Sequence, residues 1–279
     1  MSVRRDDLSP HRLVSRVTPM EKVQAMHFET AGEGPAILLL HAFPLDGRMW
    51  RGQIRALAAE HRVLAPDMPG FGASPKPEGN PSLDDWAKAV LALCKTNGVA
   101  SALVAGCSMG GYLAFAMHRI NPEFSTGFAL VNTRASADSQ DARRTRYEMV
   151  ERARHEGTDF LLQTNPPLSP ATFAGQPDVV SFVRTMTQDA TPVGVMAAQR
   201  AMASRIDSRS QLGSIKVPVS VIYGVDDPVI SRAEVEAMAA SIPGAVFAPI
   251  VDAGHLSPVE KPADVTAHII ALTRRVFPA

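Results

Sequence analysis

Short apolar runs alternate along most of this chain with segments of helical periodicity. Several runs are apolar throughout, which is typical of strands buried on both faces of a mostly parallel sheet. The predicted strands are Val23–Glu29, Ala36–His41, Arg62–Pro66, Ser101–Gly106, Gly127–Val131, Val217–Tyr223 and Ala245–Ile250. Strands that alternate with helices in this way predict a doubly wound α/β sheet with right-handed crossovers.

The clearest predicted helix follows Ser82, which is expected to cap its N-terminus, and ends near Gly98. Its apolar residues recur at spacings of three and four and therefore lie on one face. Further helices are predicted over Gly110–Asn121 and Pro262–Arg275.

The alternation stops between residues 132 and 212, where the pattern contains no convincing strand. Helices are predicted there over Asp138–His155, Asp178–Gln188 and Pro192–Ala203. Because the sheet resumes directly afterwards, we expect these helices to form an inserted cap, or lid. The predicted organisation is an N-terminal arm (1–20), a core (21–131 and 213–279) and a helical cap (132–212).

Composition excludes several classes of protein. The 279 residues contain 28 Lys and Arg against 28 Asp and Glu, so no charge excess points to nucleic acid or to an anionic membrane. Hydrophobic residues make up 46%, which excludes a disordered chain. Cys94 and Cys107 cannot form a disulfide framework, and the N-terminus has no apolar signal region. A cytoplasmic protein is expected.

The segment Gly106-Cys-Ser-Met-Gly110 lies between a predicted strand and a predicted helix. This is the G-x-S-x-G pattern of a nucleophile elbow in the strand–turn–helix context that it requires. Glycines at both ends remove the Cβ atoms that would collide in so sharp a turn. Ser108 is therefore the candidate nucleophile.

A serine hydroxyl needs a base, and the base needs an acid to orient it. Of the eight histidines, His255 lies in a loop after the last predicted strand, at the sheet edge where the elbow also lies. Asp226 or Asp227, in the loop after the preceding strand, could supply the carboxylate. For the oxyanion we expect the backbone N–H groups of Met109 and Phe43. His41 is expected to be a loop anchor.

Five segments in order resemble the α/β-hydrolase superfamily, over nearly the whole chain from about Glu21 to Phe277. They are Leu40–Pro44, Asp67–Ser74, Gly106–Gly110, Gly224–Asp227 and Gly254–Pro262. The resemblance implies an α/β, mostly parallel eight-stranded sheet. It also places the acid three residues after Gly224, which selects Asp227, and the order Ser, Asp, His is that of the family.

Within the superfamily, the segment Leu130–Asp138 and the Arg-rich helix after it look like bacterial esterases and 3-oxoadipate enol-lactonase-like hydrolases. Ser108 argues against haloalkane dehalogenases and epoxide hydrolases, which use an aspartate. Met109 and Leu256 stand where prolyl aminopeptidases and carbon–carbon bond hydrolases, respectively, commonly carry Trp. Cofactor-free perhydrolases share the sequence Ser-Met-Gly-Gly, found here at Ser108–Gly111, so a perhydrolase is kept as an alternative.

The leading hypothesis is a serine carboxylesterase for small or medium acyl chains, with Ser108, His255 and Asp227 as its triad. A lactonase, a perhydrolase or a non-catalytic receptor on the same fold are the alternatives. No cofactor is expected, and no residue spacing indicates a metal site. The expected binding partner is a small ester or lactone substrate. The sequence does not decide whether the protein forms a homo-oligomer. Arg143, Arg144 and Arg146 are interpreted as a solvated helix face, because Asp138, Asp141 and Glu148 surround them.

Overall fold

The structure is a computed structural model that describes residues 26–278. Its described strands form one sheet in the order β1-β3-β2-β4-β5-β6-β7, in which β1 runs antiparallel to β3 and all other pairs are parallel. The strands are β1 (Phe28–Ala31), β2 (Ala36–Leu40), β3 (Arg62–Pro66), β4 (Ala102–Cys107), β5 (Ser125–Val131), β6 (Val219–Gly224) and β7 (Val246–Ile250). The predicted α/β class and the mostly parallel sheet are confirmed.

The expected count of eight strands is wrong for the described residues, which form seven. Before β2 they contain a single strand, β1, which lies at the sheet edge on β3. The predicted strand Val23–Glu29 begins outside the described residues, as does the whole expected arm over residues 1–20.

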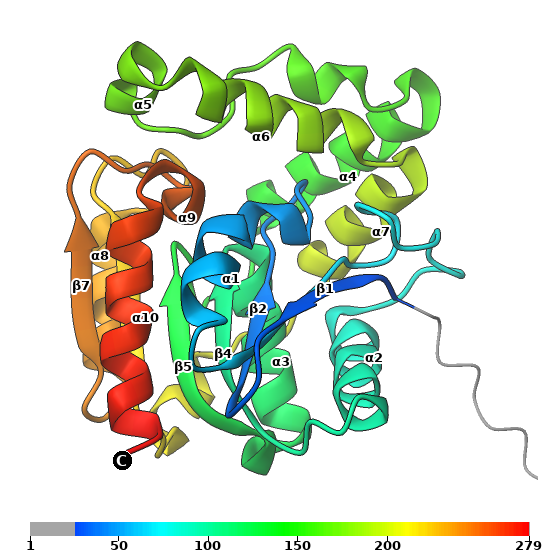
Figure 1. Ribbon diagram of the computed structural model, residues 1–279. Helices are drawn as coiled ribbons and strands as arrows, with labels where there is room; N and C mark the ends of the chain where they lie inside the picture. Colours follow the sequence, from blue (N-terminus) through cyan, green and yellow to red (C-terminus); the bar gives the residue numbers. More distant parts are fainter. Residues whose placement is uncertain (1–25, 279) are drawn as a thin grey trace, which may run out of the picture.

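Helices cover both faces of the sheet (Figure 1). Successive residues of a strand point to opposite faces, so Leu38 and Leu40 pack in one core cluster and Ile37 and Leu39 in the other. The core helices are α1 (Arg51–Leu57), α2 (Leu83–Thr96), α3 (Met109–Ile120), α8 (Arg232–Ala240), α9 (Ser257–Glu260) and α10 (Pro262–Val276). Helices α2, α3 and α8 cover one face, and α1 and α10 cover the other.

Local sequence signals account for the limits of α2. The Ser82 hydroxyl accepts the N–H of Asp85, whose carboxylate accepts the N–H of Ser82 in return, which is a capping box. At the other end Gly98 takes φ +72°, a conformation that favours glycine. The predicted start and end of this helix are confirmed.

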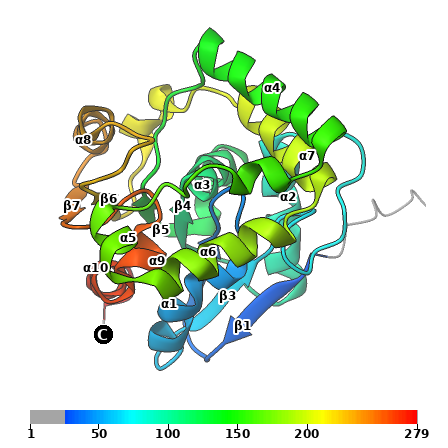
Figure 2. The ribbon, with the colours of Figure 1, turned by 90° about the horizontal axis from the view of Figure 1, so that it is seen from above.

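Four helices stand between β5 and β6, and the described residues of that interval form no strand. They are α4 (Gln140–Glu156), α5 (Pro170–Gly175), α6 (Pro177–Asp189) and α7 (Pro192–Ala203). They lie over the carboxyl ends of the strands (Figure 1), and α4 and α7 pack side by side (Figure 2). The described residues also form short 3₁₀ helices, at Gly47–Trp50, Pro122–Phe124, Asp159–Leu162 and Arg209–Ser214.

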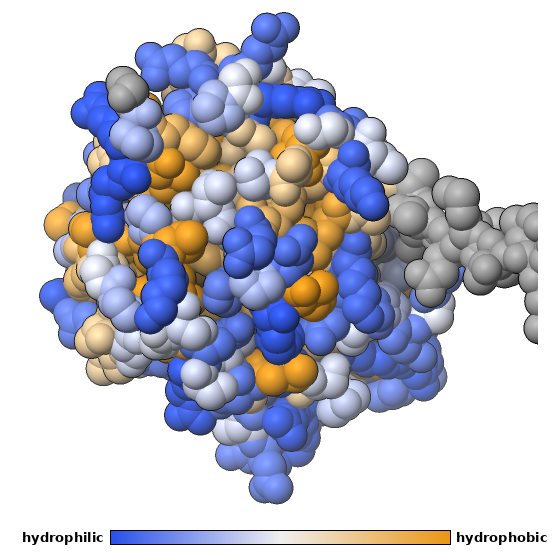
Figure 3. Space-filling view, turned by 90° about the horizontal axis from the view of Figure 1, so that it is seen from below, coloured by the Kyte–Doolittle hydropathy of each residue, from blue (hydrophilic) through white to orange (hydrophobic). Residues whose placement is uncertain are grey.

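The face opposite these helices carries many hydrophilic residues, with hydrophobic ones in separate patches among them (Figure 3). None of the helices in the described part of the chain is both long enough and apolar enough to cross a bilayer.

Candidate active site

Ser108 lies on a sharp turn between β4 and α3, with φ +52° and ψ −110°. A non-glycine residue at positive φ is strained and persists only where its surroundings hold it. A Cβ on Gly106 would come within 3.0 Å of the backbone of Gly110 and Gly111, and one on Gly110 would collide with the backbone of Leu40. Gly106 therefore has the steric role within the turn that the sequence predicted, whereas Gly110 makes room for the neighbouring strand β2.

The fold brings Ser108, His255 and Asp227 together. Ser108 Oγ lies 2.8 Å from His255 Nε2, although the two residues are 147 positions apart in the chain. His255 Nδ1 lies 3.0 Å and 2.9 Å from the two carboxylate oxygens of Asp227. All three follow parallel strands at their carboxyl ends, which meet at one edge of the sheet.

Asp227 is surrounded by hydrogen-bond donors. Its Oδ1 accepts the backbone N–H groups of Val229 and Ile230, and its Oδ2 accepts the amide of Asn132. Although burial opposes ionisation, His255 and these donors hold the pKa of Asp227 below its ordinary value. Asp226, the alternative left open by the residues alone, is exposed and uses its backbone N–H to bond Ala253.

Asn132 is a site residue that the sequence pattern did not reveal. It is fully buried at the end of β5, with φ +43°. Its amide nitrogen donates to Asp227 and to the carbonyl of Gly254, and its amide oxygen accepts the Ser257 hydroxyl at 2.6 Å. An Asn at the carboxyl end of a strand was the available signal, and its contacts show that it holds the Asp227 carboxylate and the Gly254 segment in place.

Glu260 is a second missed residue. It is 2% exposed, and its carboxylate accepts four hydrogen bonds, which satisfy a buried charge. The donors are the backbone N–H groups of Gly254, Leu256 and Ser169 and the hydroxyl of Thr172. Glu260 thus joins the His255 loop to the start of α5. Glu260 lies in the family-like segment Gly254–Pro262, but that segment does not contain Ser169 or Thr172, so these two partners could not be predicted from it.

The two expected oxyanion donors, Phe43 and Met109, lie on either side of Ser108 in the chain. Met109 is the first residue of α3, where backbone N–H groups have no acceptor within the helix. Phe43 lines the same cavity as Ser108. His41 is fully buried, and its ring bonds the N–H of Met68 and the carbonyl of Ala42, as expected for a loop anchor.

A cavity of about 430 Å³ opens over Ser108 and His255. That volume lies within the range of small-molecule sites. Much of its wall is apolar, from the sheet side (Phe43, Pro44, Leu45, Val229 and Leu256) and from the helical segment between β5 and β6 (Met149, Leu161, Leu162, Val183 and Met202). The cavity can hold an apolar group of small-molecule size beside the Ser108 hydroxyl.

The interpretation of three arginines as one solvated face is wrong for Arg146. Arg143 and Arg144 are exposed, and Arg144 pairs with Asp141 and Glu148. Arg146 instead lies on the inner side of α4, lines the cavity and pairs with the buried carboxylate of Asp138. The sequence pattern of α4 did not distinguish the inward-facing Arg146 from the exposed Arg143 and Arg144. The reason is that α4 packs against α7 through polar as well as apolar side chains.

Within residues 26–278, no group of three or more His, Cys, Asp and Glu side chains is arranged to hold a metal ion.

Comparison with known proteins places this geometry among hydrolases. The family model described as alpha/beta hydrolase fold matches residues 35–262. A thermophilic esterase from Thermogutta terrifontis, solved with malate bound, is 39% identical, with a TM-score of 0.87 over 90% of this chain and 93% of its own. The enol-lactonase from Burkholderia xenovorans LB400 is 28% identical, with a TM-score of 0.82 over 89% of this chain and 96% of its own. The 3-oxoadipate enol-lactonase 2 of Acinetobacter baylyi is 27% identical over 255 residues, 90% of this chain and 94% of that protein.

Proposed function

Because the chain belongs to the α/β hydrolase fold family, we propose that it is a serine hydrolase that cleaves carboxylic esters through an acyl-enzyme intermediate. The observation that carries the proposal is the run of hydrogen bonds from Ser108 through His255 to Asp227 beneath a largely apolar cavity. The cavity volume supports acyl groups of small or medium length.

In the proposed mechanism, Ser108 Oγ attacks the ester carbonyl carbon while His255 Nε2 accepts its proton. Asp227 holds the ring through Nδ1 and stabilises the imidazolium. The backbone N–H groups of Met109 and Phe43 bind the oxyanion. His255 then protonates the departing alcohol, and a water activated by His255 releases the acid and restores Ser108.

Replacement of the nucleophile tests this proposal. Ser108→Ala should lower kcat for p-nitrophenyl butyrate by about 10³-fold or more and abolish labelling by a fluorophosphonate probe. Ser241→Ala, at an exposed serine that directly follows α8, is the matched control and should leave both unchanged. Full activity of the Ser108→Ala variant would refute the mechanism.

A lactonase is the second candidate, because enol-lactonases align with this chain over most of its length. The same groups would open a ring ester without losing the alcohol portion. Turnover of a small lactone panel beside linear esters of equal carbon number separates the two activities.

We also propose that residues 132–212 act as a cap over a core formed by 21–131 and 213–279. Cys94 and Cys107 are both buried and free, which supports a reducing compartment such as the cytoplasm.

A further inference from the structure

The end of β5 holds both peptide units that flank Ser108. The N–H of Ser108, which belongs to the peptide before it, donates to the carbonyl of Val131 at 3.0 Å. The carbonyl of Ser108, which belongs to the peptide after it, accepts the hydroxyl of Thr133 at 2.8 Å. A non-glycine residue keeps a positive φ only where its surroundings hold it, so these two bonds help to fix the strained elbow.

The peptide after Ser108 carries one of the two proposed oxyanion donors. Its carbonyl belongs to Ser108 and its N–H to Met109, and because this peptide is trans and planar the two groups point in opposite directions. A bond that fixes the direction of the carbonyl therefore also fixes the direction of the N–H. The Met109 N–H has no acceptor within residues 26–278, so it is available to a substrate oxygen.

Thr133 reaches this carbonyl from outside α3. The other bonds to it in the described structure come from the N–H groups of Gly111 and Tyr112, at 2.9 Å and 3.3 Å, in the first turn of α3. Those two bonds orient the peptide relative to α3 alone. The Thr133 hydroxyl orients it relative to β5, where the preceding residue, Asn132, holds the carboxylate of Asp227. The oxyanion donor and the acid thus share the end of one strand as their support.

Tight packing holds the Thr133 hydroxyl in place. Thr133 is fully buried. A Cβ on Gly111 would come within 2.3–2.5 Å of the Oγ1, Cγ2 and Cβ atoms of Thr133, so this side chain lies directly against the start of α3. The close contact fixes the hydroxyl against the Ser108 carbonyl.

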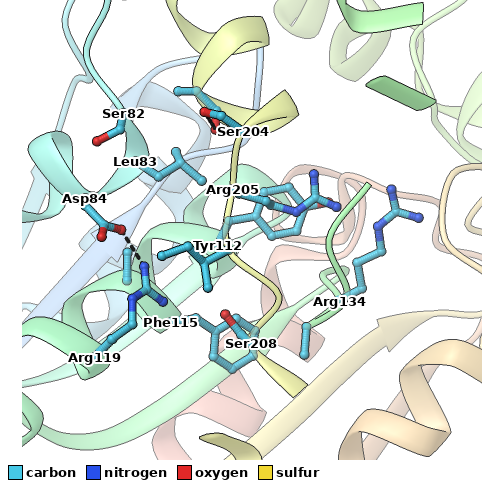
Figure 4. Close-up of a pocket in the computed structure, with 14 residues that line it drawn as sticks. Ser82, Leu83, Asp84, Tyr112, Phe115, Arg119, Arg134, Ser204, Arg205 and Ser208 are labelled. Carbon is cyan, nitrogen blue, oxygen red and sulfur yellow. Dashed lines mark hydrogen bonds and ion pairs between the residues drawn. The ribbon is translucent and has the colours of Figure 1, made fainter. Parts of the chain in front are cut away.

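No arginine takes the place of this hydroxyl. Arg134, which follows Thr133 in the chain, and Arg205 line a pocket of about 110 Å³ (Figure 4), and both pair with Asp138. Among the described residues no charged side chain donates to the Ser108 carbonyl, so Thr133 supplies its one side-chain hydrogen bond.

We propose that Thr133 is a positioning residue of the hydrolase, whose hydroxyl orients the Ser108–Met109 peptide so that the Met109 N–H points at the oxyanion. A hydrogen bond received by the carbonyl also polarises the peptide and makes its N–H a stronger donor. This effect grows as negative charge develops on the substrate oxygen, so it lowers the barrier rather than improving substrate binding. The proposal rests on the proposed hydrolase function and on Met109 as an oxyanion donor.

Replacing the hydroxyl by a methyl group of similar shape tests the proposal. A methyl carbon keeps about 3.3 Å or more from an oxygen, so Thr133→Val removes the bond and also pushes on the Ser108 carbonyl. We expect kcat for p-nitrophenyl butyrate to fall by about tenfold to thirtyfold, with KM within about twofold, because the α3 bonds remain and the donor is displaced rather than lost. Thr133→Ser keeps the hydroxyl and should recover most of the loss.

Thr273→Val is the matched control. Thr273 is buried in α10, and its hydroxyl donates to the carbonyl of Ile270 at 2.9 Å, so this substitution also removes a hydroxyl-to-carbonyl bond, but away from the site. It should lower the urea midpoint about as much as Thr133→Val does and leave kcat unchanged. If Thr133→Val has the kinetics of wild type and of Thr273→Val, the proposal is overturned.

An inhibitor that forms an oxyanion separates positioning from a purely structural role. With 1,1,1-trifluoroheptan-2-one, Ser108 Oγ adds to the carbonyl carbon, the C=O electron pair moves to the oxygen, and His255 takes the hydroxyl proton. Thr133→Val should raise the Ki of this ketone by about the factor by which kcat/KM falls, and leave the Ki of heptan-2-ol, which has no carbonyl, within about twofold. Equal losses for the two inhibitors would overturn the proposal.

The pH profile checks that the triad is not what changes. The acid limb of kcat/KM, which reports the base, should not move in Thr133→Val, because in the described structure Thr133 bonds neither His255 nor Asp227. A shifted limb would mean that the substitution acts through His255 and would overturn the proposal. If Thr133→Val does not fold, Thr133→Ser and Thr133→Ala make the same comparison, since they differ only in the hydroxyl, and equal rates for them would overturn it.

The outcomes also separate this proposal from the function on which it rests. If wild type hydrolyses the ester through Ser108 while Thr133→Val keeps full kcat, the role of Thr133 is overturned and the hydrolase function stands. If neither ester hydrolysis nor binding of the trifluoromethyl ketone depends on Ser108, both are overturned.

Discussion

Glu260 accepts the backbone N–H groups on both sides of His255, from Gly254 at 3.0 Å and from Leu256 at 3.1 Å. Its other carboxylate oxygen accepts the N–H of Ser169 at 2.7 Å. The N–H of His255 itself donates to the carbonyl of Pro167. The peptide units around the proposed base are therefore held jointly by a buried core carboxylate and by the segment that leads into α5.

Glu260→Gln should lower kcat for p-nitrophenyl butyrate by about 10- to 100-fold, with little change in KM. The new NH₂ group would face backbone donors and shift the His255 loop, and a displacement of about 1 Å can cost about 10²-fold in rate. KM should hold because Glu260 does not line the cavity. Glu236→Gln, at an exposed glutamate paired with Arg232, is the control. A rise in KM alone would argue against a positioning role.

The two adjacent aspartates give a sharp test of the acid. Asp227→Asn should lower kcat by about 10⁴-fold, because an amide facing His255 Nδ1 favours the wrong tautomer. Asp226→Asn should keep kcat within about twofold, since Asp226 contacts the site only through its backbone. Steady-state kinetics of both variants decide the assignment, and a large loss in Asp226→Asn would reverse it.

The elbow glycine is expected to tolerate no side chain. Gly106→Ala places a Cβ against the backbone of Gly110, so it should cost about 1–3 kcal/mol of unfolding free energy and displace Ser108. Gly213→Ala is the control, because the added Cβ would lie more than 4 Å from every residue outside its own stretch of chain. Urea unfolding of both variants measures the difference, and equal stabilities would contradict the steric argument.

His41 links stability to pH. Burial lowers the pKa of His41, so its ring binds a proton more weakly in the folded than in the unfolded chain. The unfolding free energy should therefore fall as pH drops below about 6.5, by at most about 1.4 kcal/mol per pH unit from this one group.

Urea unfolding between pH 7.5 and 5 measures this slope. His41→Gln, which still offers an oxygen to the N–H of Met68, should flatten it. A remaining slope is expected from His118, whose pKa burial also lowers. Asp227 does not contribute in this window, because its lowered pKa makes its stabilisation disappear only at more acidic pH. The same slope in wild type and variant would contradict the role of His41.

Local sequence signals predicted the features whose causes lie within a few residues of each other in the chain. Apolar runs located most of the strands, because burial on both faces needs no knowledge of the partner strand. The glycines around Ser108 marked the elbow, and the collision that Gly106 avoids, with Gly110 and Gly111, arises within five residues. The turn after β6 narrowed the acid to two aspartates, but the residues by themselves did not choose between them.

Other features depended on partners that are distant in the chain. Glu260 bonds Thr172 and Ser169, 88 and 91 positions away, and Asn132 bonds Asp227, 95 positions away. Arg146 belongs to a polar helix whose sequence is that of a solvated face, yet the packing of α4 over the core turns this side chain toward Asp138 and the cavity.

The sequence by itself determined the α/β class, the elbow at Ser108 and the chemical type of the site. These follow from periodicity, from glycine sterics and from residue types in short motifs. Tertiary structure alone showed how Glu260 and Asn132 bond the segments around Asp227 and His255, and that three arginines but no acidic residue of the described part line the cavity. The physical reason is that hydrogen bonds and charge compensation act over a few ångströms in space, between residues that the chain separates by a hundred positions.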